Sequence, residues 1–420
     1  MKKIIVPGKI MPAQISIPSS KSLSHRALIT AALADGVSVI HSLAENNDTR
    51  ATLSIMEKAG ASFTKEGNDL IVHGMHQMSY DGSVLDCGES GSTLRFLIPL
   101  FSLSAEEAVF TGHGKLMERP QNVYEEIYAK QGLLFQKINE ELHVKGPLQS
   151  GTYALQGNVS SQFISGFMFA LPLLAGDSVI EVKPPYESAS YVGLTMDALK
   201  RSEIQVEQEG LSYRIKGQQV YQPIDCTVEG DDSQMAFFAM EALIHHVPLD
   251  VLNIRHDSRQ GDHVIVDLVK RMGGQAEEIE NGYRFDGISL HACVIDLADC
   301  PDLGPALFAL ASQCEGETTF INAGRLRVKE SDRIACMEEE MRKLGCVISS
   351  KDSTVTVQGK TAVHGGAVLN GHNDHRIVMA LSVLASIADQ PVTIEGSEAV
   401  NKSYPDFFMD LQKTGVNVHD

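Results

Sequence analysis

The sequence predicts an α/β protein of two lobes, each made of three copies of one supersecondary unit. A helix-start motif and an apolar helix recur six times, about 70 residues apart, beginning at Ser20, Ser90, Ser160, Gly230, Cys300 and Asn373. A strand and a second helix follow, and the second helices end at Gly60, Gly132, Ser202, Gly273, Gly345 and Gly415. In five copies, two alternating strands around a Gly, Asn or Asp turn then indicate a hairpin.

The two helices of each copy differ in pattern. The first helices are apolar on nearly every side, as in residues 163–176 and 377–388, which predicts that they are buried. The second helices are amphipathic: Ile334 and Met337 recur at helical spacing, whereas Glu338 lies on the opposite face. We therefore expect the second helices to cover the outside of the sheets.

The sixth copy stops after its first strand at Asp420, and the strand-like N-terminal segment KKIIVPG, residues 2–8, can supply the missing piece. This predicts that residues 1–18 join residues 230–420 in a C-terminal lobe and that residues 19–229 form an N-terminal lobe. We expect the ligand to bind in a cleft between the lobes, since such clefts are common binding sites.

Composition restricts the class of protein. The 420 residues are 43% hydrophobic, with a formal net charge of −19, which disfavours binding to nucleic acid and to anionic membranes. The seven cysteines form no CxxC pair, so we predict reduced thiols rather than a disulfide framework or a zinc site. No apolar run suits a signal peptide or a membrane span, and we expect a cytoplasmic protein.

Polar residues at the helix starts share one phase of the repeat. A helix N-terminus favours anions, because its backbone N–H groups are free and the macrodipole is positive there. The first three starts add cations, hydroxyls and glycine: Lys21, Ser22, Arg26, Gly91, Ser92, Arg95, Ser160, Ser161 and Gln162. The remaining starts add Arg119, Ser188, Tyr191, Arg327, Lys329, Glu330, Arg333, Asp374, His375, Arg376 and Lys402.

Four arginines are predicted to lie in first turns, namely Arg26, Arg95, Arg333 and Arg376. A cation there opposes the macrodipole and costs about 0.3–1 kcal/mol unless an anion is near. Taken singly, the hydroxyls are ordinary caps, and an acidic neighbour such as Glu330 can pair with one of the arginines. Their coincidence at one phase favours a site for anionic ligands.

Two carboxylates stand among these cations. Asp302 occupies a helix-start position, where a cap would explain it, and Glu330 lies between Lys329 and Arg333, where a surface ion pair would explain it. If they line the cleft, both can transfer protons. His375 alone is more often a structural histidine than a catalyst, and the HNDH spacing is weak evidence for a metal, so we predict no metal.

At this point the sequence resembles the 5-enolpyruvylshikimate-3-phosphate synthase family along its whole length. The matching motifs, in order, are SSKSLSHRALITAALADG, GESGSTLRFL, LMERP, SSQFISG, RVKESDR, NDHRIVMAL and NKSYPDF. The resemblance implies a two-lobed inside-out α/β barrel of six βαβαββ repeats with buried helices. It also implies transfer of the enolpyruvyl group of phosphoenolpyruvate to the 5-hydroxyl of shikimate 3-phosphate, with release of phosphate and with neither metal nor organic cofactor.

The resemblance also implies two ligand sets. The set for shikimate 3-phosphate is Lys21, Ser22, Arg26, Ser160, Ser161, Gln162, Ser188, Tyr191, Asp302 and Lys329. The set for phosphoenolpyruvate is Lys21, Gly91, Arg119, Gln162, Arg333, Arg376 and Lys402. In an addition and elimination sequence, Asp302 would accept the hydroxyl proton and Glu330 would exchange the proton at C3, with Lys21 and His375 as helpers.

Some positions depart from the family pattern. Glu89 and Arg325 replace asparagines that many relatives have, and Ser92 and Phe96 replace a more familiar Thr and Pro. Gly91 leaves room that an alanine would fill, which is a hypothesis for sensitivity to glyphosate, the inhibitor of this family.

Three alternatives have sequence features that argue against them. A UDP-N-acetylglucosamine enolpyruvyl transferase typically has a reactive cysteine in its mobile loop, but the corresponding GHGKLMERP has none, and SSKSLSHR is intact. A non-catalytic anion-binding protein would not need both Asp302 and Glu330. An RNA-binding protein is disfavoured by the acidic charge. We expect a monomer whose partners are the two small-molecule substrates.

Overall fold

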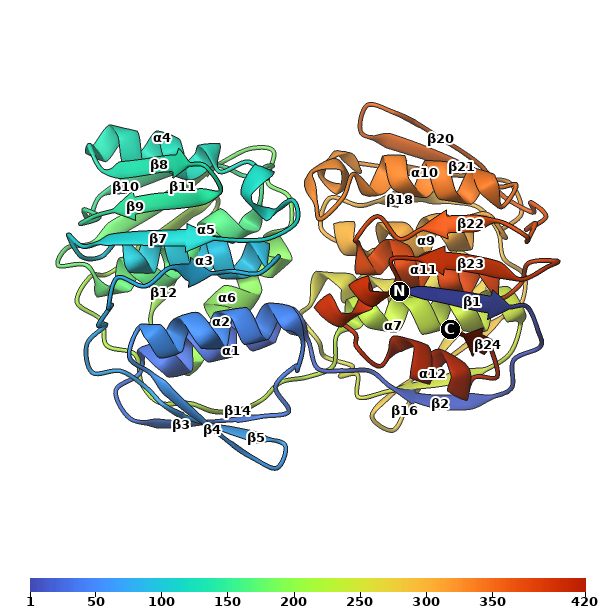
Figure 1. The fold of residues 1–420 in the computed structure, drawn as a ribbon, viewed down its shortest axis with the longest axis horizontal. Helices are drawn as coiled ribbons and strands as arrows, with labels where there is room; N and C mark the ends of the chain where they lie inside the picture. The colour runs from blue at the N-terminus through green and yellow to red at the C-terminus, as the bar shows by residue number, and fades with distance from the viewer. The chain divides into compact units, whose positions relative to one another are not determined.

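The fold is described from a computed structural model that covers residues 1–420. The chain forms two compact units (Figure 1). The N-terminal unit is Ser19–Glu229, and the C-terminal unit combines Met1–Pro18 with Gly230–Asp420.

The N-terminal unit contains three copies of the repeat. The first contributes α1 (Lys21–Leu33), β3 (Val37–His41), α2 (Asn47–Lys58), β4 (Ser62–Glu66) and β5 (Asp69–His73). The second contributes β6 (Leu85–Asp86), α3 (Gly91–Phe101), β7 (Glu107–Thr111), η1 (Leu116–Glu118), α4 (Asn122–Gln131), β8 (Leu134–Ile138) and β9 (Glu141–Lys145). The third contributes β10 (Thr152–Gln156), α5 (Ser161–Ala170), η2 (Leu171–Leu173), β11 (Ser178–Lys183), α6 (Ala189–Arg201), β12 (Val206–Glu209) and β13 (Ser212–Ile215), and β14 (Asp225–Thr227) follows.

The C-terminal unit repeats this order. Its N-terminal strands are β1 (Lys2–Val6) and β2 (Ala13–Ser16), and its first copy contains α7 (Asp232–His245), β15 (Leu249–Leu252), η3 (Gly261–Val264), α8 (Ile265–Arg271), β16 (Gly274–Ile279) and β17 (Gly282–Gly287). The next contains β18 (Val294–Asp296), η4 (Pro301–Leu303), α9 (Gly304–Ala311), β19 (Glu317–Ile321), η5 (Gly324–Val328), α10 (Arg333–Lys343), β20 (Val347–Lys351) and β21 (Thr354–Gln358). The last contains β22 (Val368–Asn370), α11 (His375–Ala385), β23 (Val392–Glu395), η6 (Ser397–Lys402), α12 (Phe407–Lys413) and β24 (Asn417–His419).

Each copy forms a four-stranded sheet with one common order, as in β6-β7-β9-β8 and β10-β11-β13-β12. The first two strands are parallel, and the other neighbours are antiparallel. The predicted hairpins are therefore confirmed. Two sheets obtain their first strand from a distant part of the chain: β14 lies parallel to β3, and β2 lies parallel to β15.

The N-terminal strand completes the last sheet, as predicted. Strand β1 lies between β23 and β24 and is antiparallel to both, with Lys2 opposite Glu395 and Ile4 opposite His419. It takes the position that the second hairpin strand occupies in the other copies. The truncated sixth copy therefore has a full sheet.

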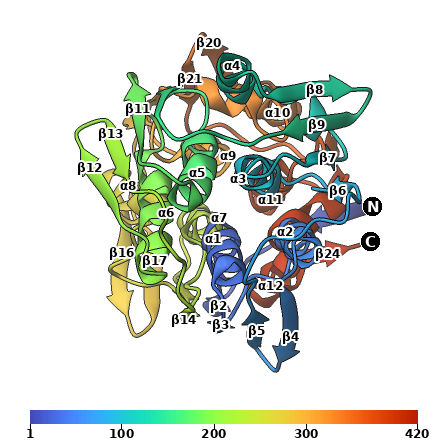
Figure 2. The ribbon, with the colours of Figure 1, turned by 90° about the vertical axis from the view of Figure 1, so that its left-hand side faces the viewer.

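The first helices form the core of each unit, which confirms their predicted burial. In α9 and α11 every residue is buried. Figure 2, which faces the N-terminal unit, shows α1, α3 and α5 near its centre, with the hairpins β4–β5, β8–β9 and β12–β13 around them. Helix α3 packs directly against α5.

The second helices do not cover the outer faces of the sheets, so that prediction is wrong. Strand residues alternate in burial: in β5, Leu70 and Val72 are buried, whereas His73 is exposed. One face of the sheet is thus open to solvent. An amphipathic pattern establishes that a helix buries one face, but it does not identify the neighbour that covers that face.

No helix of the chain is both long enough and apolar enough to cross a membrane. All seven cysteines are free thiols, and only Cys293 is partly exposed.

Helix α7 buries the carboxyl group of Glu241, which has no exposed surface, in its third turn. Burial raises the pKa of Glu241 to about 8, although a hydrogen bond with Thr414 opposes this shift. The Thr414 hydroxyl lies 2.6 Å from Glu241 Oε1 and 2.7 Å from the Leu411 carbonyl oxygen. Since a hydroxyl has one proton, it can donate to only one of these two oxygens at a time.

This geometry predicts a pH-dependent stability. The pKa of Glu241 is raised above its ordinary value of 4.5, so the folded state binds a proton that the unfolded state has lost between about pH 4.5 and 8. The free energy of unfolding should therefore fall by about 1.4 kcal/mol per pH unit in this window because of Glu241. Urea unfolding of the wild type and Glu241→Gln at several pH values should show that the variant lacks this slope. The exposed substitution Glu207→Gln is the control, and equal slopes in all three proteins would contradict the assignment.

Candidate active site

In the N-terminal unit, hydrogen bonds join the starts of four helices. Lys21 Nζ, at the start of α1, lies 2.9 Å from Asp48 Oδ2 at the start of α2. The Thr93 hydroxyl of α3 donates to the Asp48 carbonyl at 3.3 Å. Gln162 of α5 donates through Nε2 to Ser92 Oγ of α3 at 2.9 Å. The predicted residues of these starts therefore gather at one end of the unit.

Arg26 lies in the second turn of α1, not in the first turn as predicted, because the helix begins at Lys21. Its guanidinium donates to Thr195 Oγ1 at 2.9 Å and to the carbonyl oxygens of Ser22 and Tyr191 at 2.6 and 2.8 Å. These acceptors are neutral, and burial lowers the pKa of Arg26 to about 10. A buried cation without a carboxylate partner is costly, so an anion bound nearby would stabilise it.

Arg95 also lies in the second turn of its helix, α3. It donates to Gln162 Oε1 at 2.8 Å and to the Pro120 carbonyl at 3.0 Å, and its guanidinium stacks 4.8 Å from the centre of the Phe163 ring. Because Gln162 also donates to Ser92, Arg95 and Ser92 together fix the orientation of the Gln162 amide.

Gly91 and Arg119 are in close contact. Arg119 lies between η1 and α4 and is 9% exposed. A Cβ atom on Gly91 would lie 2.7 Å from Arg119 Nη1 and 3.0 Å from its Cζ, which is closer than real Cβ contacts. Only glycine at position 91 lets the guanidinium lie against the start of α3 in this way.

The predicted hydroxyls take different positions. Ser160 caps α5 by accepting from the backbone N–H of Gln162 at 3.3 Å, and Ser161 begins that helix. Ser188 precedes α6 in the left-handed region with φ of 54°, which is uncommon for serine. Tyr191 lies in the first turn of α6, and its carbonyl holds Arg26.

In the C-terminal unit, Asp302 is bound by three cations. Its carboxylate accepts from Arg333 Nη1 at 2.9 Å and Arg376 Nη2 at 3.2 Å, and Lys329 Nζ lies 3.2 Å from Oδ1. The interpretation of Asp302 as a cap is wrong. It lies within η4, and α9 begins later, at Gly304, without a side-chain cap.

Arg333 is the first residue of α10 and is buried. It donates to Glu330 Oε2 and Asp374 Oδ2, each at 2.8 Å, as well as to Asp302. Burial by itself would lower the pKa of Arg333, but Asp374, Glu330 and Asp302 outweigh it and raise that pKa. Arg333 therefore stays charged and joins three segments of the chain.

Lys329 has a lowered pKa. Burial is the largest cause; Asp302 opposes it, and Arg325 and Arg333 lower the value further, so that the pKa of Lys329 is about 8. Arg325 is thus close enough to act on Lys329 electrostatically.

The last predicted residues surround the start of α11. Arg376 also donates to Ser233 Oγ at 2.9 Å, and its Nε–H is buried without a hydrogen-bond partner. His375 is buried, with Nδ1 3.9 Å from Asp374 Oδ1. Lys402, at the end of η6, donates to the Asn373 carbonyl at 2.5 Å.

Sequence reasoning missed several partners of the predicted residues. Asp48 pairs with Lys21, Asp374 with Arg333, and Ser233 with Arg376. Asp48 and Asp374 each stand at a helix start, where a capping role explains an acidic residue. The only available signal in the sequence was that Asp48 and Asp374 stand at helix starts, as the predicted cations do.

Two solved enzymes share the fold. The EPSP synthase from Acinetobacter baumannii superposes with a TM-score of 0.82 at 26% identity, covering 100% of this chain and 99% of that one. The enolpyruvyl transferase NikO from Streptomyces tendae superposes with a TM-score of 0.80 at 16% identity, covering 100% and 98%. The fold is therefore that of the enolpyruvyl transferases.

The chain belongs to the EPSP synthase (3-phosphoshikimate 1-carboxyvinyltransferase) family, which it matches over residues 5–411. It is 41% identical to the 3-phosphoshikimate 1-carboxyvinyltransferase of Clostridium kluyveri, over 100% of this chain and 99% of that protein. Its identity to the Clostridium acetobutylicum enzyme of the same name is also 41%, over 98% and 96%. The chain is thus an enzyme of enolpyruvyl transfer in the shikimate pathway, which confirms the predicted family and activity.

The lowered pKa of Lys329 predicts an abnormal titration. At pH 8 about half of its side chains should be neutral, whereas an ordinary lysine titrates near 10.4. The protein can be labelled by reductive methylation with ¹³C and titrated by NMR, and the Lys329 signal can be assigned from its loss in Lys329→Arg. A midpoint near 10 for that signal would contradict the structure.

Proposed function

We propose that both units supply ligands to one active site, in which the enolpyruvyl group of phosphoenolpyruvate is transferred to the 5-hydroxyl of shikimate 3-phosphate and phosphate is released. The N-terminal unit mainly binds shikimate 3-phosphate, and the C-terminal unit mainly binds phosphoenolpyruvate. Family membership and the cations at the helix starts support this proposal.

The observation that carries the shikimate 3-phosphate side is the buried guanidinium of Arg26, whose hydrogen bonds all go to neutral acceptors. A phosphate group supplies the charge that these acceptors lack. Hydroxyls and an amide complete the contacts. The proposed set is Lys21, Ser22, Arg26, Ser160, Ser161, Gln162, Ser188 and Tyr191, with Asp302 and Lys329 from the C-terminal unit.

The phosphoenolpyruvate side is supported by the unpartnered Nε–H of Arg376, since a buried guanidinium donor favours an anionic acceptor. The proposed set is Arg333, Arg376 and Lys402 from the C-terminal unit, with Lys21, Gly91, Arg119 and Gln162 from the N-terminal unit. Lys21 belongs to both sets, so that one ammonium group lies between two anions that repel each other.

In the proposed mechanism, the 5-hydroxyl attacks C2 of phosphoenolpyruvate while C3 gains a proton. The resulting tetrahedral intermediate then loses phosphate and a methyl proton. Asp302, whose carboxylate contacts Arg333, Arg376 and Lys329, is the proposed acceptor of the hydroxyl proton. Glu330 exchanges the proton at C3, and Lys21 and His375 assist.

These proton transfers need only side chains, so we propose a reaction without metal or organic cofactor. One chain supplies every proposed ligand, which supports a monomeric enzyme. The net charge of −19 argues against nucleic acid or anionic membranes as partners. We also propose a cytoplasmic location.

Neutralising either carboxylate should slow the chemical step far more than it weakens substrate binding. Asp302→Asn and Glu330→Gln should each lower kcat by about 10²- to 10⁴-fold, the usual contribution of general acid–base catalysis. Calorimetry should still detect binding of shikimate 3-phosphate. Glu338→Gln, a neutralised carboxylate elsewhere on the same helix as Arg333, is the matched control. Near-normal phosphate release by both variants would remove these residues from the mechanism.

Adding one methyl group at Gly91 should displace Arg119. Because the new Cβ would lie 2.7 Å from Arg119 Nη1, Gly91→Ala should raise the KM for phosphoenolpyruvate. The expected rise is about tenfold, as for loss of roughly one charge-assisted hydrogen bond. The KM for shikimate 3-phosphate should stay unchanged, and resistance to glyphosate should increase. Gly193→Ala, where nothing lies within 4 Å, is the control. Equal glyphosate resistance in wild type and Gly91→Ala would refute this hypothesis.

A further inference from the structure

A strained turn leads into α11. After β22 ends at Asn370, His372 and Asn373 have φ of 49° and 53°, so two consecutive residues other than glycine adopt the left-handed region. Left-handed backbone is unfavourable for such residues and persists only where surrounding contacts hold it. The contacts that hold this turn therefore decide where the residues after it lie.

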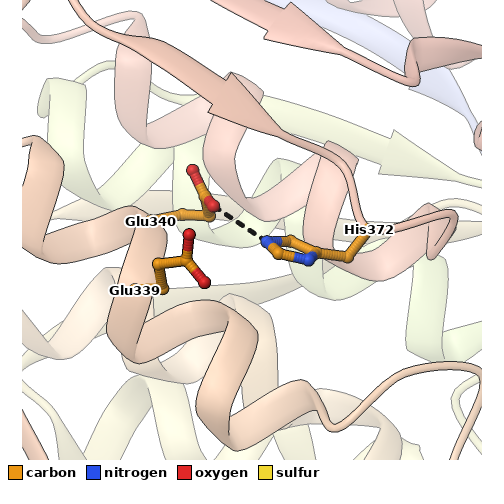
Figure 3. A group of neighbouring side chains, drawn as sticks. All are labelled: Glu339, Glu340 and His372. Atoms are coloured by element: carbon orange, nitrogen blue, oxygen red, sulfur yellow. Dashed lines mark hydrogen bonds and ion pairs between the residues drawn. The ribbon is translucent and has the colours of Figure 1, made fainter.

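Glu340 of α10 supplies two of those contacts. One carboxylate oxygen accepts from the Asn370 backbone N–H at 3.0 Å, and the other lies 2.8 Å from His372 Nε2. Figure 3 shows the imidazole facing this carboxylate across the gap between the helix and the turn. Glu340 has no exposed surface, and Lys343 Nζ lies 2.8 and 2.9 Å from its two oxygens.

Both partners are charged near neutral pH. Burial by itself would raise the pKa of Glu340, but its hydrogen bonds with His372, Lys343 and Asn370 outweigh it and lower that pKa. Contact with Cys336 and then with Glu340 raises the pKa of His372 to about 10. The contact between Glu340 and His372 is thus an ion pair.

The turn is connected to three of the cations proposed to bind phosphoenolpyruvate. The Asn373 carbonyl accepts from Lys402. Asp374, the next residue, accepts from Arg333 Nε at 2.8 Å and caps α11 through the backbone N–H of Arg376 at 3.0 Å. A movement of this turn would displace Arg333, Arg376 and Lys402 together.

We propose that Glu340 and His372 are positioning residues for the phosphoenolpyruvate side of the active site. Together they form a clamp that holds the left-handed turn, and the turn sets the places of the three cations. The inference rests on the proposed function, because it assumes that these cations bind phosphoenolpyruvate.

The same side chains do not make a metal centre. Glu339, Glu340 and His372 bring potential ligand atoms within 4.8 Å of one another. However, the Lys343 ammonium contacts both carboxylates, at 3.2 Å for Glu339, and the charged His372 supplies the second positive charge. A metal ion would have to displace the ammonium group and the imidazole proton.

Steady-state kinetics of two single variants and their combination test the clamp. His372→Asn keeps a residue that tolerates left-handed backbone but is too short to reach Glu340. Glu340→Gln keeps the size and removes the charge. Each should raise the KM for phosphoenolpyruvate about tenfold and leave the KM for shikimate 3-phosphate within about twofold. The KM for phosphoenolpyruvate of the combined variant should be no higher than that of Glu340→Gln alone, because the interaction that His372→Asn removes is already broken there.

Controls separate the possible failures. Glu338→Gln changes a carboxylate on the same helix that pairs with Arg342 rather than with the turn, so its KM for phosphoenolpyruvate should remain near the wild-type value. An unchanged KM in His372→Asn, a multiplied effect in the combined variant, or loss of thermal stability alone would overturn the clamp. Arg376→Lys tests the proposed function separately: if it leaves the KM for phosphoenolpyruvate unchanged, the assignment of that ligand set fails regardless of the clamp.

Discussion

The C-terminal unit depends on one buried cation, Arg333, which binds carboxylates from three separate segments: Asp302, Glu330 and Asp374. A buried guanidinium is tolerated only when anions compensate its charge, and each of these carboxylates is in turn fixed by Arg333. The interaction therefore joins the segment before α9, the start of α10 and the start of α11. It converts helix starts that are far apart in the chain into one polar cluster.

The N-terminal unit accommodates a buried guanidinium in a different way. Arg26 is equally buried, but it donates to a hydroxyl and two carbonyl groups rather than to acids. Dipolar acceptors orient the guanidinium without neutralising it. In the C-terminal unit, by contrast, the Asp302 carboxylate forms ion pairs with Arg333 and Arg376 and compensates their charge.

Much of the fold could be predicted because it depends on local pattern. All-round apolar helices can only be buried, and alternating strands around a Gly or Asn turn form hairpins regardless of their neighbours. The pairing of β1 within the last sheet was predictable because the sixth copy lacks a strand. The exposure of the outward face of the sheets could not be predicted in this way, because an amphipathic pattern does not say which element covers a helix.

The site shows the same limit at the level of single residues. The helix-start pattern singled out Arg26, Arg95 and Asp302, but it predicted the two arginines in the first turn instead of the second, and it left a cap open as the explanation of Asp302. A shift of a few residues in a helix start changes which backbone N–H groups lack a hydrogen-bond partner within the helix.

The sequence by itself determined the repeat, the buried helices, the family and the types of residue at the helix starts, since these depend on spacing and side-chain chemistry along the chain. Only the tertiary structure decided which charges meet. The pairs Lys21 with Asp48 and Glu340 with His372 join separate elements, and β14 and β2 join sheets far from their own position in the chain. Such contacts follow from how the helices and sheets pack, which no local pattern encodes.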